Sequence, residues 1–444
     1  MAEKGPAMTF SLEPAQLAWC AELRSLAAER LHPLADKGEP GHVNRTLVAE
    51  LGGLGLLGRL FTSGALDLCL MRESLAYACT EAETALALQG LGAHPVHAYG
   101  TEAQRARWLP RVTAGTAIAA FALSEPGAGS DAAALDLRAE ADDSRSGRSS
   151  DMSQGGWSPD ASLGGRSSDA SLGGRSSDAS LGGWSPDASL GGRSSDTPAF
   201  TAAPDGPARW RLTGEKCWIS NAPEADFYTV FARTTPGAGA RGVTAFLVPA
   251  DRPGLTGRGL DMLSPHPIGA LDFDAVPVTA GDVLGEVDRG FRVAMGTLNL
   301  FRPSVGAFAV GMAQAALDAT LTHTAGRDAF GGKLRDLQAV SHQVAEMALR
   351  TEAARLMVHA AASAYDADDP DVPRRSAMAK LLATETAQYV VDTAVQLHGA
   401  RALQRGHLLE HLYREVRAPR IYEGASEVQR GIIAKELYAR QEAR

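Results

Sequence analysis

The chain has 444 residues, of which 45% are hydrophobic and 21% charged, a balance typical of a folded protein with two or three domains. Its 43 basic and 52 acidic residues give a formal charge of −9 without a dense Lys/Arg cluster, which argues against a nucleic-acid or anionic-membrane surface. The four cysteines are scattered and form no C-x-x-C pair, so we expect buried thiols in a reducing compartment and no metal site.

The beginning of the chain gives no sign of a targeting segment. Residues 1–10 contain one lysine and no long apolar run, so we expect no signal peptide. No uninterrupted apolar stretch has the length of a bilayer span. We therefore expect a cytoplasmic protein that does not enter a membrane.

Apolar residues recur at helical spacing in the first part of the chain, in the segments 12–31, 47–60 and 71–91. Gly100 then predicts a helix end, and Thr101 predicts a capped start of the next helix. These patterns predict an N-terminal α-helical domain over residues 1–117.

The pattern changes to short strand-like segments after residue 117. They are separated by turn residues and are Ile118–Leu123, Trp210–Thr213, Lys216–Ser220, Phe227–Phe231, Gly242–Val248 and Ala270–Phe273. We predict a central β domain over residues 118–284, with a small β-barrel as its form. The fold class is thus α+β and multidomain.

A nine-residue repeat interrupts this β domain between Gly147 and Asp196, with units such as GRSSDASLG and GWSPDASLG. Each unit is mostly Gly, Ser and Asp, and it cannot bury enough apolar area to offset the entropy lost on ordering. We expect a disordered insertion at 144–199. A short β-solenoid or a binding tract is the alternative.

The last part of the chain, residues 285–444, is again helical in pattern. Four long runs begin near Gly290, Leu334, Arg374 and Ser426, and small residues dominate their faces. Short connections between long helices favour an antiparallel four-helix bundle.

A glutamate precedes the last of these helices, in the sequence IYEGASEVQ of residues 421–429. Ser426 and Gln429 have the spacing of a capping box, so we predict that the helix starts near Ser426 and that Glu423 lies in the turn before it. A carboxylate beside Gly424 could abstract a proton from a molecule that approaches the backbone. The alternative is an acidic residue that only favours the positive end of the helix.

Together, six segments in this order resemble the acyl-CoA dehydrogenases, flavoenzymes that form a 2,3-double bond in an acyl thioester. The segments are FALSEPGAGSD at 121–131, KCWISNA at 216–222, RDAFG at 327–331, Gln338, QLHG at 396–399 and IYEGASEVQ at 421–429. Each is weak alone, and their order and separation give the resemblance its weight. It covers the chain except for the repeat.

The resemblance implies FAD as cofactor, held between the β domain and the bundle. The implied cofactor contacts are Leu123, Ser124, Gly129, Ser130, Trp218, Ser220, Arg327, Phe330, Gln338, Gln396, Gly399, Ala400, Ala425 and Glu427. The implied substrate contacts are Ser130, Arg302 and Gly424. On residue pattern alone, Trp218 also fits a buried strand aromatic, and Arg302 a helix-end cation before Pro303.

The resemblance also implies a mechanism in which Glu423 abstracts the α-proton and flavin N5 accepts the β-hydride. Some relatives place the base immediately before the arginine that matches Arg302, but here that residue is Phe301, which leaves Glu423 as the candidate. An electron-transfer flavoprotein is the implied electron acceptor. A homodimer or homotetramer is implied because the FAD site spans two subunits.

The chain departs from the family pattern at four places. Gly399–Ala402 replaces a Gly-Gly-x-Gly segment, Ala425 replaces a threonine, Asn299 replaces an aspartate, and residues 60–71 lack a longer Gly-rich loop. Other interpretations stay open: the same chemistry on a carrier-protein-bound acyl group, a flavin oxidase or monooxygenase, and a nucleic-acid-binding flavoprotein. The acidic composition and the presence of Glu423 count against the last.

Overall fold

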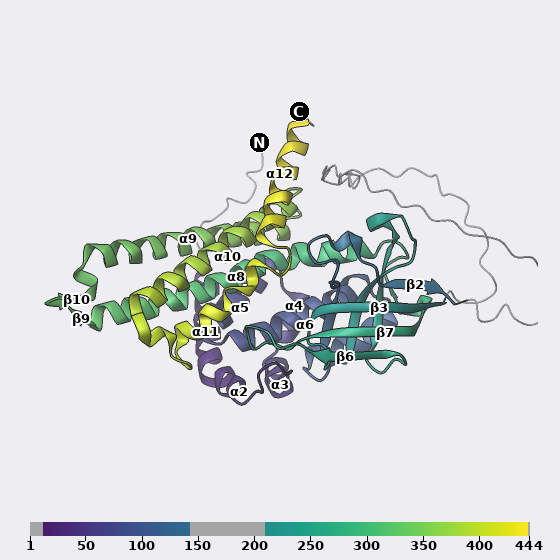
Figure 1. Cartoon of the computed structure of the whole chain (residues 1–444), viewed down its shortest axis with the longest axis horizontal. Helices are drawn as coiled ribbons and strands as arrows, with labels where there is room; N and C mark the ends of the chain where they lie inside the picture. Colours follow the sequence, from purple (N-terminus) through teal and green to yellow (C-terminus); the bar gives the residue numbers. More distant parts are fainter. Residues whose placement is uncertain (1–11, 143–208, 443–444) are drawn as a thin grey trace, which may run out of the picture. The chain divides into compact units, whose positions relative to one another are not determined.

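The N-terminal domain is a layer of helices, as predicted (Figure 1). The computed structural model describes residues 12–142 and 209–442. The helices are α1 (Pro14–Leu26), a π-helical segment (Ala27–Leu31), α2 (His32–Ala35), α3 (Arg45–Gly53), α4 (Leu56–Thr62), α5 (Ala65–Ala78), α6 (Thr80–Tyr99) and α7 (Glu102–Thr113). The predicted run 71–91 is two helices, because Cys79 adopts an extended conformation between α5 and α6.

The predicted capped start of α7 is confirmed. The Thr101 hydroxyl accepts the Gln104 N–H at 3.2 Å, and the Gln104 side chain accepts the Thr101 N–H at 2.7 Å. The Gln104 amide also donates to the carbonyls of Gly281 and Val283, at 2.9 and 3.2 Å. The cap therefore also ties the helical domain to the β domain.

The central domain is an eight-stranded mixed sheet. Its strands are β1 (Ala119–Ala122), β2 (Arg138–Ala141), β3 (Arg209–Ser220), β4 (Phe227–Arg233), β5 (Val243–Pro249), β6 (Leu255–Gly259), β7 (Ile268–Thr279) and β8 (Val283–Leu284). The hydrogen-bonded order is β6-β7-β3-β2-β4-β5-β8, and β1 pairs in parallel with β4. The two predicted segments 210–213 and 216–220 form the single strand β3. The central β domain is confirmed, and the repeat predicted at 144–199 lies outside the described residues.

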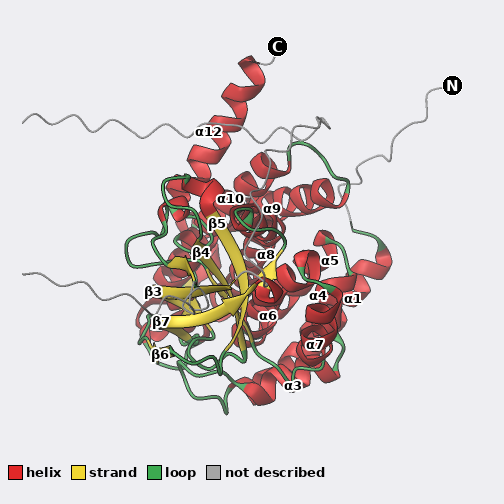
Figure 2. Ribbon diagram, turned by 90° about the vertical axis from the view of Figure 1, so that its right-hand side faces the viewer, coloured by secondary structure: helices red, strands yellow, loops and turns green. Residues whose placement is uncertain are grey.

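Helices cover this sheet: α6 packs against β1 and β4, and α8 (Gly290–Gly326) packs against β5 (Figure 2). Every residue of β5 is buried, Thr244 included. On β4, Phe227 lies 4.5 Å from the Trp108 ring and Phe231 lies 4.9 Å from the Phe121 ring, measured between centroids. These aromatic contacts extend the core from the sheet into α7 and β1.

The C-terminal domain is the predicted helical bundle. Its elements are α8 (Gly290–Gly326), a hairpin of β9 (Asp328–Ala329) and β10 (Gly332–Lys333), α9 (Gln338–Asp366), α10 (Val372–His398), α11 (Leu408–Glu415) and α12 (Ser426–Glu442). Helices α8, α9 and α10 pack on one another, α12 packs on α10, and α5 packs on α8. Within the described residues α8 is long and apolar enough to cross a membrane, but 72% of its most apolar window is buried, as in a core helix.

Glycines on α8 explain how closely its neighbours approach. A Cβ added at Gly306 would lie 2.7 Å from Val358 of α9, and one added at Gly311 would lie 2.4 Å from the Glu73 carbonyl oxygen of α5. Both distances are shorter than real Cβ contacts. The small residues read from the sequence therefore set the spacing between the N-terminal domain and the bundle.

Candidate functional site

The turn before α12 holds Glu423 in an unusual backbone conformation. Glu423 has φ 52° and Gly424 has φ 92°, so two consecutive residues are in the left-handed region. A Cβ at Gly424 would lie 2.4 Å from the Gln429 amide nitrogen. The position therefore needs glycine both for its positive φ and for this close approach. A non-glycine residue with positive φ persists where its surroundings fix it, and such residues cluster at functional sites.

Three side chains fix this turn through its carbonyl groups. The Gln429 amide donates to the carbonyls of Glu423 and Gly424 at 3.1 and 2.9 Å, and the Lys380 ammonium donates to that of Gly424 at 2.7 Å. Arg302 Nε donates to the Glu423 carbonyl at 3.4 Å. The backbone of Glu423 is thus tied to α8, α10 and α12.

The Glu423 side chain has cations nearby but no direct partner. Its Oε2 atom is buried and accepts no hydrogen bond from the described residues, although the residue as a whole is only half-buried. Burial raises the pKa of the carboxyl, and the charges of Arg72, Lys380 and Arg302 oppose that rise. Because the carboxyl end determines the pKa, the buried Oε2 matters more here than the exposure of the whole residue.

The predicted residue Arg302 lies beside this glutamate. It is buried inside α8, which continues through Pro303, so the alternative of a helix-end cation is wrong. Its Nη1 donates to Asn299 Oδ1 at 3.1 Å, the residue that stands where the family often has an aspartate. The neighbouring Phe301 is fully buried, and its ring centroid lies 6.1 Å from that of His94.

The capping box predicted at the start of α12 is wrong, although the helix does start at Ser426. The Ser426 hydroxyl donates to Glu385 Oε1 at 2.6 Å, and the Gln429 Oε1 atom accepts no hydrogen bond from the described residues. Gln429 instead uses its NH₂ group on the carbonyls of the preceding turn. Tertiary partners have replaced the local cap.

The loop 123–131 lies directly against strand β3. The Cys217 N–H donates to the Ser124 carbonyl at 3.0 Å. Lys216 is fully buried and donates to the Leu123 carbonyl at 2.9 Å and to Glu125 Oε1 at 2.7 Å. Burial lowers the pKa of Lys216 to about 8 despite the Glu125 carboxylate. The fold thus joins the two motifs proposed to contact the flavin, and on this loop Gly129 and Ser130 are exposed.

Trp218 is an exposed aromatic in the interior of a strand. It is 48% exposed and has φ 57°, at a point where the pairing of β3 with β7 shifts register between Lys216 and Ile219. The alternative of a buried strand aromatic is therefore wrong. The irregularity presents a large ring at the surface close to Ser220, which is partly buried.

The other predicted cofactor residues gather at the end of the bundle away from the sheet (Figure 1). Arg327 directly follows α8, Phe330 is 90% exposed at the tip of the β9–β10 hairpin with φ 53°, and Gln338 begins α9. Gln396, Gly399 and Ala400, at the end of α10, are exposed as well. A single chain does not bring this group together with Trp218. Ala425 and Glu427 lie near Glu423, and Glu427 contacts Arg430 at 3.1 Å.

Comparison with known proteins agrees with this arrangement. Profiles described as acyl-CoA dehydrogenase N-terminal, middle and C-terminal domains match residues 13–116, 191–276 and 288–438. The short-chain specific acyl-CoA dehydrogenase of Bos taurus is 32% identical over 426 residues, 93% of this chain and 88% of that protein. The probable acyl-CoA dehydrogenase FadE25 of Mycobacterium tuberculosis is 30% identical over 391 residues, 87% of this chain and 82% of that protein. The chain belongs to the acyl-CoA dehydrogenase family.

A solved structure extends this to three dimensions. Butyryl-CoA dehydrogenase from Megasphaera elsdenii is 28% identical, with a TM-score of 0.78 over 97% of this chain and 100% of that chain. The resemblance and the fold class inferred from the sequence are therefore confirmed. The protein is an oxidoreductase of the acyl-CoA dehydrogenase type.

For this acyl-CoA dehydrogenase, the sequence did not predict three features around Glu423. They are the cations Arg72 and Lys380 and the hydrogen bonds that Gln429 donates to the turn. Lys380 offered a signal, since it is a single cation on a small-residue face of α10 and is fully buried. Burial lowers its pKa to about 8. Arg72 offered a similar signal within the apolar run of α5.

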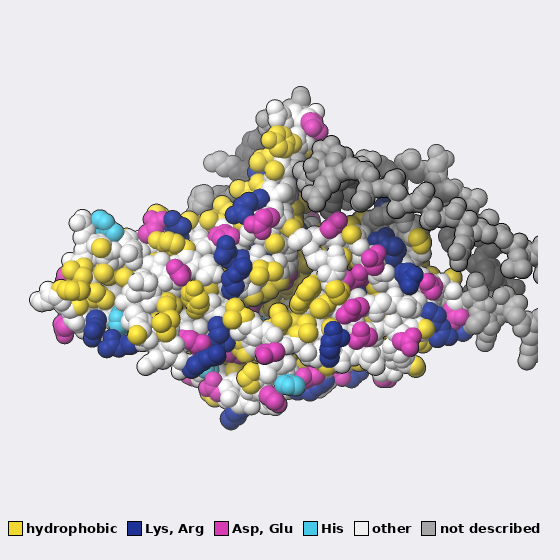
Figure 3. All heavy atoms as spheres, viewed as in Figure 1, with side chains coloured by type: hydrophobic (Ala, Val, Ile, Leu, Met, Phe, Trp, Pro, Cys, Tyr) yellow, Lys and Arg dark blue, Asp and Glu magenta, His cyan; other side chains and the backbone are white. Residues whose placement is uncertain are grey.

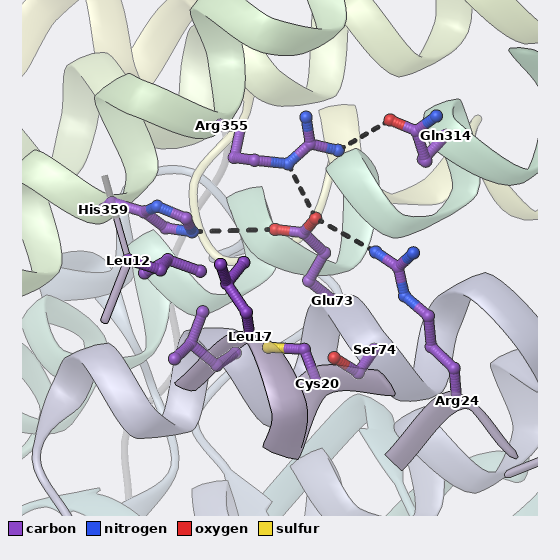
Figure 4. Close-up of a pocket in the computed structure, with 10 residues that line it drawn as sticks. Leu12, Leu17, Cys20, Arg24, Glu73, Ser74, Gln314, Arg355 and His359 are labelled. Atoms are coloured by element: carbon purple, nitrogen blue, oxygen red, sulfur yellow. Dashed lines mark hydrogen bonds and ion pairs between the residues drawn. The ribbon is translucent and has the colours of Figure 1, made fainter. Parts of the chain in front are cut away.

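A cavity of about 320 Å³ lies between α1, α5, α8 and α9 (Figure 4). Glu73 is at its centre, with Arg355 donating to its Oε1 at 2.8 Å and His359 and Arg24 lying 3.7 and 3.8 Å away. The side chains of α1 that line it include Leu17 and are mostly apolar. None of the predicted site residues lines this cavity.

Proposed function

We propose that this protein is an FAD-dependent dehydrogenase that forms the 2,3-double bond of an acyl-CoA, with Glu423 abstracting the α-proton. Family membership supports acyl-CoA dehydrogenation in general. The relatives named for short-chain and butyryl substrates favour a short acyl group. On the face of the molecule drawn in Figure 3, a hollow lies below the base of α12 and is bordered by hydrophobic side chains. Such a hollow suits an apolar acyl group.

The buried, unpaired Glu423 carboxyl is the observation that carries the proposal. The α-proton of a thioester is weakly acidic, and a carboxylate removes it more readily when its pKa lies closer to that of the substrate. Burial moves the pKa of Glu423 in that direction, and the free Oε2 atom leaves a site for the proton. Arg302 and Lys380 hold the turn, so the backbone that carries this carboxyl does not have to be ordered during the reaction.

The same turn offers a donor for the charge that develops on the thioester oxygen. The N–H of Glu423 has no hydrogen-bond acceptor among the described residues, while the carbonyls of Glu423 and Gly424 are all engaged. A free backbone N–H held in a rigid turn stabilises an oxyanion without reorganisation. Gly424 is needed here for the turn itself, since a Cβ would collide with the Gln429 amide that binds its carbonyl.

The residues present fit an FAD. The exposed ring of Trp218 and the polar groups of Ser124 and Ser220 suit a planar, hydrogen-bonding ring system, and Leu123 lies beside them. At the bundle end, the cation Arg327 and the exposed ring of Phe330 suit a pyrophosphate and an adenine. When bound, FAD would supply the acceptor for the hydride that leaves the β-carbon.

The separation of these two groups supports an assembly in which a second copy completes each site, as a homodimer or homotetramer. The space beside Gly399 is open, because an added Cβ there would meet nothing within 4 Å. The Gly399–Ala402 segment is therefore compatible with a ligand. An electron-transfer flavoprotein as acceptor and a cytoplasmic location remain part of the proposal.

An anaerobic screen of acyl-CoAs tests this function. The purified holoprotein is mixed with acyl-CoAs of increasing length and branching, and loss of the oxidised flavin band is followed. Rapid bleaching by one short acyl-CoA, with the enoyl product found by mass spectrometry, would support the proposal. A yellow protein that none of them bleaches, while the same acyl group on a carrier protein does, would replace acyl-CoA by a carrier-bound substrate.

A further inference from the structure

A fully buried lysine in the β domain is not used by the mechanism above. Lys216 lies on β3, and its ammonium donates to the Leu123 carbonyl at 2.9 Å and to Glu125 Oε1 at 2.7 Å. Both partners belong to the loop that follows β1, so Lys216 joins that loop to β3. A buried ion pair adds little net stability compared with apolar residues of the same size. What these contacts fix is the position of the loop against the strand.

The Glu125 carboxylate also closes the base of this loop. Glu125 is buried, its Oε1 atom accepts the Leu137 N–H at 3.0 Å, and its Oε2 atom accepts the Asp136 N–H at 2.5 Å. These two N–H groups lie just before β2, so the carboxylate joins the two ends of the segment 125–137. The loop therefore has a fixed base before any ligand binds.

The tip of the loop, in contrast, is open. Gly129 and Ser130 are exposed, and within residues 12–142 and 209–442 their N–H groups have no hydrogen-bond acceptor. A Cβ added at Gly127 or Gly129 would meet nothing within 4 Å. Free backbone N–H groups on a fixed loop bind a polar ligand without reorganisation. The loop thus has the form of a preformed binding loop.

Lys216 attaches this loop to the irregular part of β3. The pairing of β3 with β7 shifts register between Lys216 and Ile219, so β7 pairs with neither of the two residues between them. Trp218 is one of these two and presents its ring at the surface with φ 57°. The other, Cys217, donates its N–H to the Ser124 carbonyl at 3.0 Å. The contacts with the loop, and not the ladder with β7, therefore hold this stretch.

We propose that Lys216 is a positioning residue for FAD, setting the loop 123–131 in place against the stretch of β3 that carries Trp218. This inference rests on the proposed function, in which these two segments hold the cofactor. The ammonium acts through the loop and does not itself touch FAD. Without it, the Leu123 carbonyl would lose its donor and the buried Glu125 carboxylate would lose its cation. The loop would then shift away from β3, and FAD would bind more weakly.

The FAD affinity of full-length variants tests this proposal. Lys216→Met keeps the length of the side chain but removes its charge, and it should raise the Kd for FAD about ten-fold or more. Equilibrium dialysis of the protein against FAD measures the Kd. Adding Glu125→Gln removes the uncompensated carboxylate, so the double variant should regain thermal stability relative to Lys216→Met. Its FAD affinity should stay weak, because the Leu123 carbonyl still lacks its donor.

The fluorescence of Trp218 gives a second readout, taken at FAD concentrations that saturate each variant. The emission of Trp218 is the part that is missing from Trp218→Phe. A flavin close to an indole ring quenches its emission, so FAD should quench Trp218 in the wild-type protein and quench it less in Lys216→Met. A loss of stability alone would not change the quenching once the site is saturated.

Arg252→Met is the matched control, because Arg252 donates to Asp282 Oδ1 at 2.6 Å in the same domain but outside both segments. It should leave the Kd for FAD and the quenching of Trp218 at their wild-type values. A Kd in Lys216→Met within about two-fold of the wild-type value, an equal loss of affinity in Arg252→Met, or recovery of affinity in the double variant would overturn the inference. A wild-type protein that binds no FAD would instead remove the proposed function, so the two failures are distinguishable.

Discussion

Glu423 and Glu73 each have a buried carboxyl oxygen with cations nearby, yet their pKa values move in opposite directions. Burial raises the pKa of each carboxyl. At Glu73 the Arg355 guanidinium, 2.8 Å away, together with His359 outweighs burial, and the pKa falls. At Glu423 no described residue donates to either carboxyl oxygen, burial prevails, and the pKa rises.

The difference lies in contact, not in the number of cations. Coulomb attraction falls with distance, and a hydrogen bond to the charged form adds to it only at contact. Glu73 therefore stays ionised and joins α5 to α9. Glu73 Oε2 also accepts no hydrogen bond from the described residues, so what separates the two is the Arg355 contact at Glu73 Oε1, which Glu423 lacks while its pKa is raised. The geometry separates a glutamate suited to holding helices together from one suited to exchanging a proton.

The largest expected effect is on turnover in Glu423→Gln. The amide keeps the size of the side chain but cannot accept the α-proton, so the rate of flavin reduction should fall about a thousand-fold or more. Stopped-flow absorbance under anaerobic conditions measures this rate, and the flavin content should equal that of the wild-type protein.

Glu73→Gln serves as the control, with a reduction rate within about two-fold of the wild-type rate because the side chain lies outside the site. Equal losses of rate in the two variants would show that removing either carboxylate has the same effect. That result would contradict a special role for the Glu423 carboxyl.

Local patterns and contacts between distant residues explain what the sequence could and could not predict. The cap at Thr101 needs only a single turn of chain, and the capped helix start was predicted correctly. Ser426 and Gln429 have the spacing of a capping box, but Glu385 and the left-handed turn at Glu423 take their hydrogen bonds. No spacing rule reports such competition, because the partner lies 41 residues away.

The site follows the same division. Glu423, Arg302 and Trp218 were singled out through motifs, and their roles stay predictions. Arg72 contacts Ser304, which follows it by 232 positions, and only the packing of α5 on α8 reveals that contact. A buried cation in an apolar helix is readable from the sequence, but its target is not.

The second prediction measures what Glu73 contributes to stability. Removing its charge leaves Arg355 partly buried with weaker compensation, which should lower the free energy of unfolding by about 3 kcal/mol. Urea unfolding of the holoprotein, followed by circular dichroism and flavin fluorescence, measures the change. Glu423→Gln should show no such loss, since its carboxyl makes no contact with a cation. A loss of the same size in Glu423→Gln would contradict the distinction between the two glutamates.

The smallest effect concerns a third buried glutamate, Glu415, whose contact is a histidine instead of an arginine. His266 Nε2 lies 2.5 Å from Glu415 Oε2. Burial disfavours the charged imidazolium, but Glu415 outweighs it and raises the pKa of His266 above 6.5. Burial acts to raise the pKa of Glu415 as well, yet His266 brings it below 4.5. The ion pair between His266 and Glu415 is lost when His266 loses its proton, whereas Arg355 keeps its charge beside Glu73.

The stabilisation from His266 is complete below pH 6.5 and is lost as the pH rises through its folded pKa, whereas that from Glu415 is lost as the pH falls through its depressed folded pKa. The pair therefore stabilises most between about pH 4.5 and 6.5. The difference in unfolding free energy between the wild-type protein and His266→Gln should shrink by about 1 kcal/mol from pH 6 to pH 8.5. Urea unfolding at the two pH values measures it. A constant difference would mean that His266 contacts Glu415 as a neutral ring, and the contrast with the permanent Arg355–Glu73 contact would disappear.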